Sequence, residues 1–267
     1  KLTSITIPKA LTSIESETFA GCEALTAIGF ESPSLVAKIE FAAFEYCGSL
    51  TSVEIPNSVS YISDRAFEYC GNLVNITIPG SVSRIGVYAF HDTPWYDSQP
   101  NGVVYIGNVA YEYKGAMPEN TNIVLPEGTK GIASFAFNGQ SNLNAITIPN
   151  SVISIGRNVF EYCTGLSFIY AKSVVPVDLS DYSYSVFNNV NKTTAILYVP
   201  TGSLSSYQNA NQWSDFENII EMNFQTSIKT SYSDSNILVT TTNRGITIHG
   251  LEIGNFIQLI DMTGAVI

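Results

Sequence analysis

A fixed interval between proline and phenylalanine runs through most of this chain. Seven prolines are each followed, eleven residues later, by a phenylalanine. The pairs are Pro8/Phe19, Pro33/Phe44, Pro56/Phe67, Pro79/Phe90, Pro126/Phe137, Pro149/Phe160 and Pro176/Phe187. Where nothing is inserted, the pairs recur every 23 residues. A period of this length predicts a solenoid, in which each repeat stacks on its neighbours and none folds alone.

Within each repeat, the segment before the proline alternates apolar and polar residues. In LTSITIP (residues 2–8), Ile5 and Ile7 are expected to point inward and Ser4 and Thr6 outward. Such alternation predicts a short strand, and the proline ends it because proline cannot donate to a ladder. An isoleucine six residues after the proline predicts a second short extended piece, and the phenylalanine is expected in a helical turn. These isoleucines are Ile14, Ile39, Ile62, Ile85, Ile132 and Ile155.

The charge balance of the chain excludes two classes of partner. There are 12 Lys and Arg against 23 Asp and Glu, and the basic residues form no cluster. Binding to phosphates requires grouped basic residues, so we expect neither a nucleic acid nor an anionic membrane surface as partner. No run of apolar residues approaches the roughly 18 that a membrane span needs, so we expect no membrane span.

The repeat itself points to a family. The pattern L-x-x-I-x-I-P, followed by V-x-x-I-x-x-x-A-F-x-x-C, resembles the BspA-like leucine-rich repeats of surface and secreted proteins of anaerobic Bacteroidetes and some parasitic protists. The resemblance covers about residues 1–224. It implies an α/β leucine-rich-repeat solenoid, strand-rich with short helical turns, of about seven repeats plus a C-terminal cap. It also implies a cell-surface or extracellular location.

The repeat pattern ends near residue 225. Residues 225–267 contain short strand-like segments separated by turns at 244–245, 254–255 and 263–264. We expect a small all-β domain here, truncated at its end. It resembles the beginning of the β-sandwich sorting domains found at the C-terminus of exported Bacteroidetes proteins.

Neither the cysteines nor the histidines form a motif typical of catalysis or metal binding. Each cysteine follows a repeat phenylalanine by three residues, and no C-x-x-C pair occurs, so we predict four buried, free structural thiols and no metal. The two histidines, His91 and His249, lie far apart in the sequence without a nucleophile motif. We therefore expect no enzyme and no cofactor. The cysteines are Cys22, Cys47, Cys70 and Cys163.

Two surfaces are candidates for binding. The first is the outward side of the strands, a flat polar face that either docks a protein or glycan or is simply solvated. Its candidate residues are Glu31, Glu54, Asn75 and Thr77. The second is an insertion at about residues 91–122.

The insertion contains VVYIGNVAYEY (residues 103–113), which predicts a hairpin around the two-residue turn Gly107-Asn108. Tyr105, Tyr111 and Tyr113 are expected near one face of it, with Trp95 and Tyr96 just upstream. Such aromatic clusters are typical of carbohydrate and protein contacts. The alternative is that these rings seal the solenoid where the repeat is interrupted.

These patterns favour a non-enzymatic, cell-surface or extracellular adhesion protein. We expect a monomer that engages a host or microbial surface protein or glycan through its solenoid. Two alternatives stay open: a carbohydrate-binding accessory module that uses the aromatic insertion, and a structural spacer.

Overall fold

The computed structural model describes residues 1–180, 185–224, 238–242 and 245–249. The chain divides into two compact units, Lys1–Met222 and Asn223–Ile267. In the second unit, β18 (Leu238–Thr242) pairs antiparallel with β19 (Gly245–His249). The other strands predicted for this unit, together with the turns at 244–245, 254–255 and 263–264, lie wholly or partly outside the described residues. Its β-sandwich character stays a prediction.

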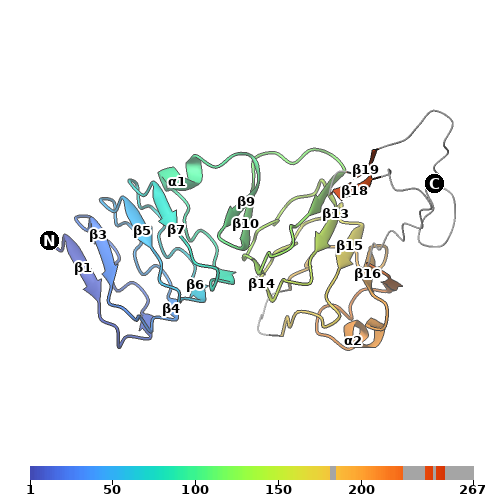
Figure 1. Cartoon of the computed structure of the whole chain (residues 1–267), viewed down its shortest axis with the longest axis horizontal. Helices are drawn as coiled ribbons and strands as arrows, with labels where there is room; N and C mark the ends of the chain where they lie inside the picture. Colours follow the sequence, from blue (N-terminus) through green and yellow to red (C-terminus); the bar gives the residue numbers. More distant parts are fainter. Residues whose placement is uncertain (181–184, 225–237, 243–244, 250–267) are drawn as a thin grey trace. The chain divides into compact units, whose positions relative to one another are not determined.

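The first unit is a solenoid whose coils each begin with a strand that runs parallel to the one before it (Figure 1). Strand β1 pairs with β3 and β5 pairs with β7, while the strands after the insertion form one continuous parallel sheet. Before the insertion, these strands are β1 (Ser4–Ile7), β3 (Ala27–Phe30), β5 (Ser52–Glu54) and β7 (Asn75–Thr77). After it, they are β11 (Thr121–Val124), β13 (Leu143–Ile148), β15 (Phe168–Ala171), β16 (Ile196–Pro200) and β17 (Asn218–Met222).

Each predicted isoleucine lies in a second, two-residue strand, and all six are buried. These strands also pair in parallel, so a second ladder runs along the solenoid. They are β2 (Ser13–Ile14), β4 (Lys38–Ile39), β6 (Tyr61–Ile62), β8 (Arg84–Ile85), β12 (Gly131–Ile132) and β14 (Ser154–Ile155). The strand-rich solenoid predicted from the sequence is confirmed.

The repeat phenylalanines stack in two columns inside the coils. Phe19, Phe44, Phe67 and Phe90 form the first, with successive ring centroids 5.1, 5.1 and 5.2 Å apart. Phe137, Phe160 and Phe187 form the second, at 5.7 and 5.5 Å. All except Phe19 are fully buried. The columns run through two apolar cores, one on each side of the insertion.

The segment around each phenylalanine, expected as a helical turn, is a succession of tight turns. The residues two before and two after the phenylalanine take a left-handed backbone, for example Ala42 (φ 52°) and Tyr46 (φ 59°). Alternate N–H groups therefore point along the solenoid axis and form a third ladder. In the second coil, Ala42, Phe44 and Tyr46 donate to the carbonyls of Asp64, Ala66 and Glu68 at 3.0, 2.8 and 3.0 Å.

The C-terminal end of the solenoid core is covered by α2 (Leu204–Gln208) and the loop after it. Trp213 and Phe216 meet the ring of Phe187 edge-on, at 5.2 and 5.1 Å between centroids. Tyr207 is buried beside Trp213. These rings protect the last coil from water, as a terminal repeat requires.

The four cysteines are free, as predicted, and three of them are fully buried. The thiols of Cys47, Cys70 and Cys163 each donate to a phenylalanine carbonyl of the preceding coil, at 3.3, 3.3 and 3.0 Å. Burial raises the pKa of each of these thiols to about 12. Cys22, in the first coil, is only half-buried.

We expect only Cys22 to react quickly when native protein at pH 8 is treated with a thiol-reactive aromatic disulfide. The other three thiols should react only on unfolding, because a pKa of about 12 leaves about one thiolate in ten thousand at this pH. Absorbance of the released thiolate measures both phases. Cys22→Ser should remove the fast phase, and a fast phase that persists in this variant would contradict the burial.

Candidate functional site

The insertion crosses the solenoid as a hairpin of β9 (Gly102–Ile106) and β10 (Val109–Lys114), joined by the predicted turn. Gly107 has φ 56°, a conformation that favours glycine. One side of the hairpin packs on the N-terminal core and the other on the C-terminal core. We call residues 102–114 the partition hairpin, because they separate the two phenylalanine columns.

The expectation that Tyr105, Tyr111 and Tyr113 share one face was wrong. The pairing of β10 with β9 shifts register between Ala110 and Glu112. Tyr105 lies opposite Ala110, so Tyr111 falls on the other face, and the bulge at Tyr111 then puts Tyr113 on the same face as Tyr105. Tyr111 packs into the N-terminal core, whereas Tyr105 and Tyr113 pack against the C-terminal core.

Strand β10 takes the place of a coil in the turn ladder. In a regular coil, Phe67 N–H donates to Ala89 O at 2.8 Å. Across the interruption, Phe90 N–H donates instead to the hydroxyl of Tyr111, at 3.1 Å. On the other side of β10, Tyr113 N–H donates to Ala136 O at 2.8 Å.

A short helix, α1 (Pro94–Asp97), is fixed to the partition hairpin. Thr93 caps its start by accepting from Tyr96 N–H at 3.1 Å. The ammonium of Lys114 donates to three backbone carbonyls at its end, those of Tyr96, Asp97 and Gln99, at 2.9, 2.7 and 2.9 Å. The same ammonium lies 5.0 Å from the centre of the Tyr96 ring.

The five aromatic residues of the insertion are therefore mainly structural in position. Tyr96 and Tyr111 are buried, and Trp95, Tyr105 and Tyr113 are half-buried against the cores. Burial raises the pKa of Tyr105 to about 12 and that of Tyr111 well above its usual value. The alternative in which the rings seal the interrupted repeat describes these positions better than an exposed platform.

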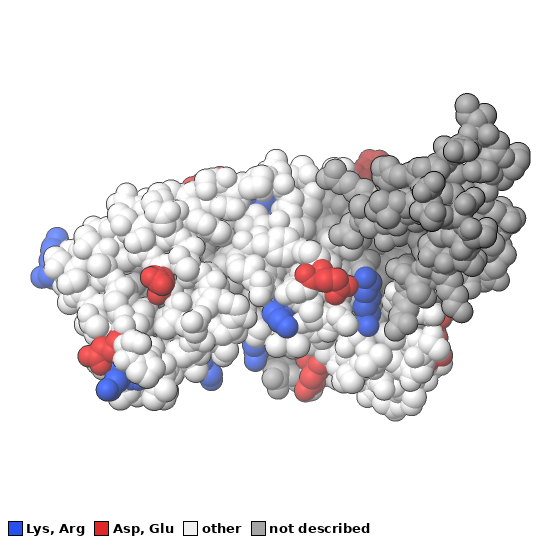
Figure 2. All heavy atoms as spheres, viewed as in Figure 1, with Lys and Arg blue, Asp and Glu red and all other residues white. Residues whose placement is uncertain are grey.

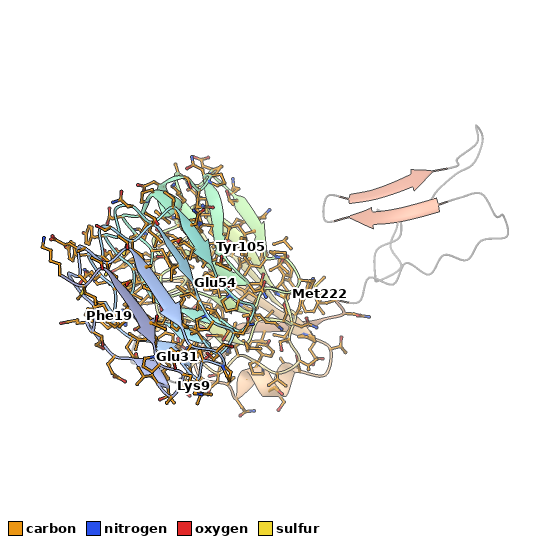
Figure 3. All side chains as sticks on the ribbon, turned by 60° about the vertical axis from the view of Figure 1, so that its left-hand side comes forward. Lys9, Phe19, Glu31, Glu54, Tyr105 and Met222 are labelled. Atoms are coloured by element: carbon orange, nitrogen blue, oxygen red, sulfur yellow. The ribbon has the colours of Figure 1, made fainter. Side chains whose placement is uncertain are left out.

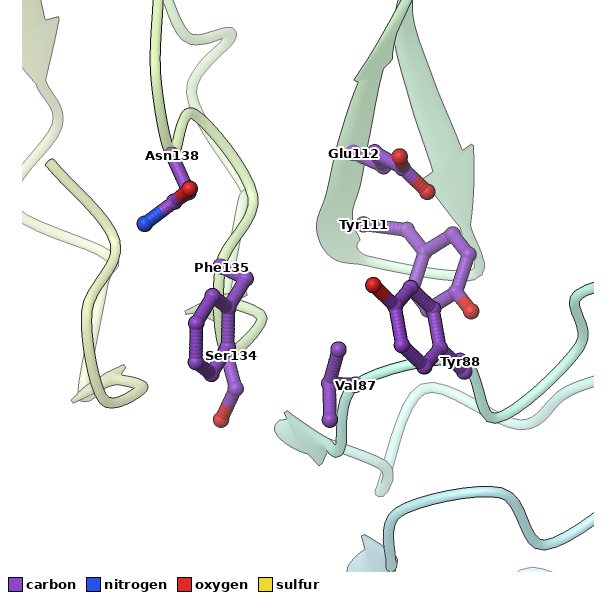
Figure 4. A pocket seen from close by; sticks show the side chains of 7 residues that line it. All are labelled: Val87, Tyr88, Tyr111, Glu112, Ser134, Phe135 and Asn138. Carbon is purple, nitrogen blue, oxygen red and sulfur yellow. The ribbon is translucent and has the colours of Figure 1, made fainter. Parts of the chain in front are cut away.

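The interruption leaves a cleft of about 220 Å³ on the turn side of the solenoid (Figure 4). Its lining comes from three segments that are distant in the sequence: the turn after β8, strand β10 and the turn after β12. On the side of the two-residue strands, the coils before and after the insertion stay in contact. There, Ser134 N–H donates to Ile85 O, and Gly131 packs against the backbone of Ser83. The lining residues are Val87, Tyr88, Tyr111, Glu112, Ser134, Phe135 and Asn138.

Aromatic and polar groups are arranged around this cleft. Tyr88 and Phe135 lie on opposite sides of it, with Glu112 above Tyr88 in the view of Figure 4. The Glu112 carboxylate accepts a hydrogen bond from His91 Nε2 at 2.6 Å. The amide nitrogen of Asn138 donates to a carboxylate outside the lining at 3.0 Å, which leaves its oxygen for the cleft.

Three exposed tyrosines lie in the turns before the insertion. Tyr46 and Tyr69 follow their repeat phenylalanine by two residues, whereas Tyr88, at the cleft, precedes Phe90 by two. We call Tyr46, Tyr69 and Tyr88 the turn ridge; their exposed fractions are 50%, 39% and 43%. Each occupies a left-handed position of its turn, with φ of 58–59°. The rings of Tyr46 and Tyr69 stack at 4.6 Å. The guanidinium of Arg65 lies 5.9 Å from the centre of the Tyr88 ring.

Carboxylates accompany the turn ridge. Arg65 forms ion pairs with Glu45 at 3.7 Å and with Glu68 at 3.1 Å. The charge of Glu68 raises the pKa of Tyr69. The sequence reasoning missed this surface, although the repeated Phe-Glu-Tyr-Cys at residues 44–47, 67–70 and 160–163 was a signal for it.

The four predicted strand-face residues, Glu31, Glu54, Asn75 and Thr77, are all exposed. Figure 3 labels the first two of them. Glu54 lies opposite Thr77 on neighbouring strands. Glu31 lies beyond the end of β3, where its carboxylate accepts from Lys9 N–H at 3.0 Å. Charged residues are sparse on the face seen in Figure 2 and form no basic patch there.

From β15 onward, the outward strand positions become largely apolar, which the sequence reasoning also missed. Tyr170 and Tyr198 are partners in register, and their rings stack at 4.9 Å. Ile220 and Met222 on β17 are exposed. The outward side of the strands is thus polar up to β13, where Asn144 donates to Asn122, and largely apolar from β15 onward.

Among the described residues, no three His, Cys, Asp or Glu side chains come together in a way that could hold a metal ion. In the same part of the chain, no helix is both long and apolar enough to cross a membrane.

Stacked parallel strands, a column of phenylalanines along the coils and a capped C-terminal end define a leucine-rich-repeat solenoid. The family described as BspA type leucine rich repeat region matches residues 1–116 and 104–237, in six copies, and the chain belongs to this family. A comparison with curated proteins found no relative.

Solved structures of several bacterial proteins are similar to this chain. The pneumococcal vaccine antigen PcpA is 18% identical with a TM-score of 0.34, over 83% of this chain and 79% of that protein. A leucine-rich repeat protein from Bacteroides ovatus is 23% identical with a TM-score of 0.38. That match covers 85% of this chain and 59% of the other. A leucine-rich cell surface protein from Faecalibacterium prausnitzii is 20% identical with a TM-score of 0.30, over 88% and 83%.

Proposed function

We propose that this chain is a non-enzymatic binding protein, located at the cell surface or outside the cell, that engages a partner protein through the turn ridge. The observation that carries this proposal is the exposure of three tyrosines in the turns before the insertion, two of them stacked on each other. Tyrosine is enriched in protein interfaces because it buries a large area and keeps a polar tip. The regular turns hold these rings in place before any partner arrives, which reduces the entropy lost on binding.

The arrangement of the rings favours a protein over a glycan. A sugar stacks on the face of an aromatic ring, but Tyr46 and Tyr69 stack on each other, at an interplanar angle of 9°. Ring edges, hydroxyl groups and the nearby carboxylates remain for contact. These groups suit a partner surface that carries basic and apolar side chains.

The polar strand face remains a second candidate for a protein or glycan partner. It carries Glu31, Glu54, Asn75 and Thr77 in exposed positions. A structural spacer, in contrast, would bind through neither surface. Variants of the two surfaces distinguish these functions.

We expect Tyr46→Ser with Tyr69→Ser to weaken partner binding at least about tenfold, because central tyrosines of an interface each contribute on the order of 1–2 kcal/mol. The melting temperature should change little, since both rings are largely exposed. A panel of purified extracellular proteins and a glycan array, screened with the unmodified protein, identifies the binders, and surface plasmon resonance measures the affinities.

The matched control is Glu54→Gln with Asn75→Ser on the strand face, which should bind as the unmodified protein does. Loss of binding only in this control would move the function to the strand face. Binding to glycans alone would contradict a protein partner, and no binding in either screen would favour the spacer.

A further inference from the structure

The cleft between Tyr88 and Phe135 has a specific chemical character. Beside the two rings it presents the Glu112 carboxylate, the Asn138 oxygen and the Ser134 hydroxyl. None of its seven lining residues is basic. Glu112 is the one charged residue among the seven, so the lining favours a ligand that brings positive charge or hydrogen-bond donors.

The nearby arginine and lysine side chains each have an anionic or carbonyl partner outside the cleft, and His91 donates to one oxygen of Glu112. Arg65 pairs with Glu45 and Glu68. Lys114 donates to three carbonyls at the end of α1. Arg157 forms an ion pair with Asp64 at 2.6 Å.

The rings of the cleft already accept cations from within the protein. Arg65 lies 5.9 Å from the centre of the Tyr88 ring, and Arg157 lies 5.7 Å from that of Phe135. An aromatic ring attracts a cation through the negative potential over its face, and a desolvated site strengthens this attraction. Two rings and a carboxylate around one cavity therefore favour a cationic group over a neutral one.

We propose that the cleft binds one basic side chain, lysine or arginine, of the partner protein that contacts the turn ridge. This inference rests on the proposed function and names the chemistry of its partner. A volume of about 220 Å³ corresponds to about seven water molecules, which suits the end of one side chain and not a folded segment. Tyr88 belongs to both the ridge and the cleft, so a segment that lies on the ridge can place a basic residue in the cleft. The net charge of −11 favours the approach of a basic partner.

The test uses small probes in place of the partner. The probes are the Nα-acetyl, N-methylamide derivatives of lysine, arginine and norleucine, together with methyl glucoside as a glycan probe. Amide chemical shifts of the full chain report binding. We expect saturable shifts at Tyr88, Glu112 and Phe135 with the lysine or the arginine probe, with a Kd on the order of 1–10 mM for so small a contact. The norleucine probe has nearly the shape of the lysine probe without its charge, so it should give no saturable shifts.

Two variants locate the effect. Glu112→Gln keeps the shape of the side chain and a hydrogen bond to His91 but removes the negative charge. It should weaken binding of the basic probe at least about fivefold. Tyr88→Leu should have a similar effect, and because Tyr88 is exposed this variant should fold normally. The control is Glu15→Gln, which makes the same charge change at an exposed position outside both candidate surfaces and should leave the probe affinity unchanged.

The proposal is overturned if norleucine binds as well as lysine, or if Glu112→Gln leaves the affinity unchanged. It is also overturned if only methyl glucoside saturates, which would indicate a sugar site, or if no probe gives saturable shifts. Failure of this proposal can be distinguished from failure of the proposed function, because the ridge variant, Tyr46→Ser with Tyr69→Ser, keeps Glu112. If the ridge variant loses partner binding while the probes fail, the ridge function stands and the cleft proposal does not.

Discussion

Phe67→Ala should lower the free energy of unfolding by about 3–5 kcal/mol. The ring of Phe67 is fully buried and lies between those of Phe44 and Phe90, at 5.1 and 5.2 Å. Its removal leaves a cavity in the column and deprives both neighbouring rings of a stacking partner. The coils cannot close over this cavity, because the ladders on every side of the coil fix their separation.

Urea denaturation followed by circular dichroism measures this loss. Tyr69→Ala is the matched control, since Tyr69 lies in the same turn with its ring largely exposed. The control should cost less than about 1 kcal/mol. A loss for Phe67→Ala as small as that of the control would show that the phenylalanine column does not stabilise the solenoid.

Tyr111→Ala is expected to be comparably damaging, at about 3–5 kcal/mol, for a different reason. Tyr111 is 2% exposed and belongs to the partition hairpin, where its hydroxyl accepts the N–H of Phe90. The substitution removes a buried ring. It also leaves the backbone N–H of Phe90, the last phenylalanine of the first column, without its acceptor. Hydrogen exchange should therefore accelerate first in the coil of Phe90 and then toward the N-terminus.

Tyr111→Phe separates the hydroxyl from the ring. It should cost about 1–3 kcal/mol, the usual penalty for a buried donor left unsatisfied. Exchange at the Phe90 amide should accelerate in this variant, while exchange in the coils of Phe137 and Phe160 should not change. If Tyr111→Phe has the stability of the unmodified protein, the hydroxyl does not complete the ladder.

The solenoid could be predicted from the sequence because its determinants are local and repeated. A proline that ends a strand, an isoleucine six residues later and a phenylalanine five residues after that occur in nearly every coil. Each of these three residues has the same environment in every coil, so the correct interpretation of one repeat predicts the structure of the others. The burial of Cys47, Cys70 and Cys163 followed from the same register.

The candidate sites depend on features that a repeat pattern does not contain. The separation of Tyr113 from Tyr111, two residues apart in one strand, results from a bulge, which strict alternation cannot anticipate. The exposure of Tyr46 and Tyr69 results from left-handed turns where a helical turn was expected. The cleft brings Tyr88 beside Phe135 across 47 residues of sequence, and only the path of the inserted chain determines that meeting.

The partition hairpin also has a consequence for how such a protein can change in evolution. To each neighbour it presents an edge like that of an ordinary coil, through Tyr111 on one side and Tyr113 on the other. Coils can therefore be gained or lost by duplication and deletion at a distance from the hairpin, with the cleft left intact. Each added coil would move the cleft about 4.8 Å further from that end of the solenoid. The reach of the molecule and the chemistry of its cleft can thus be selected independently.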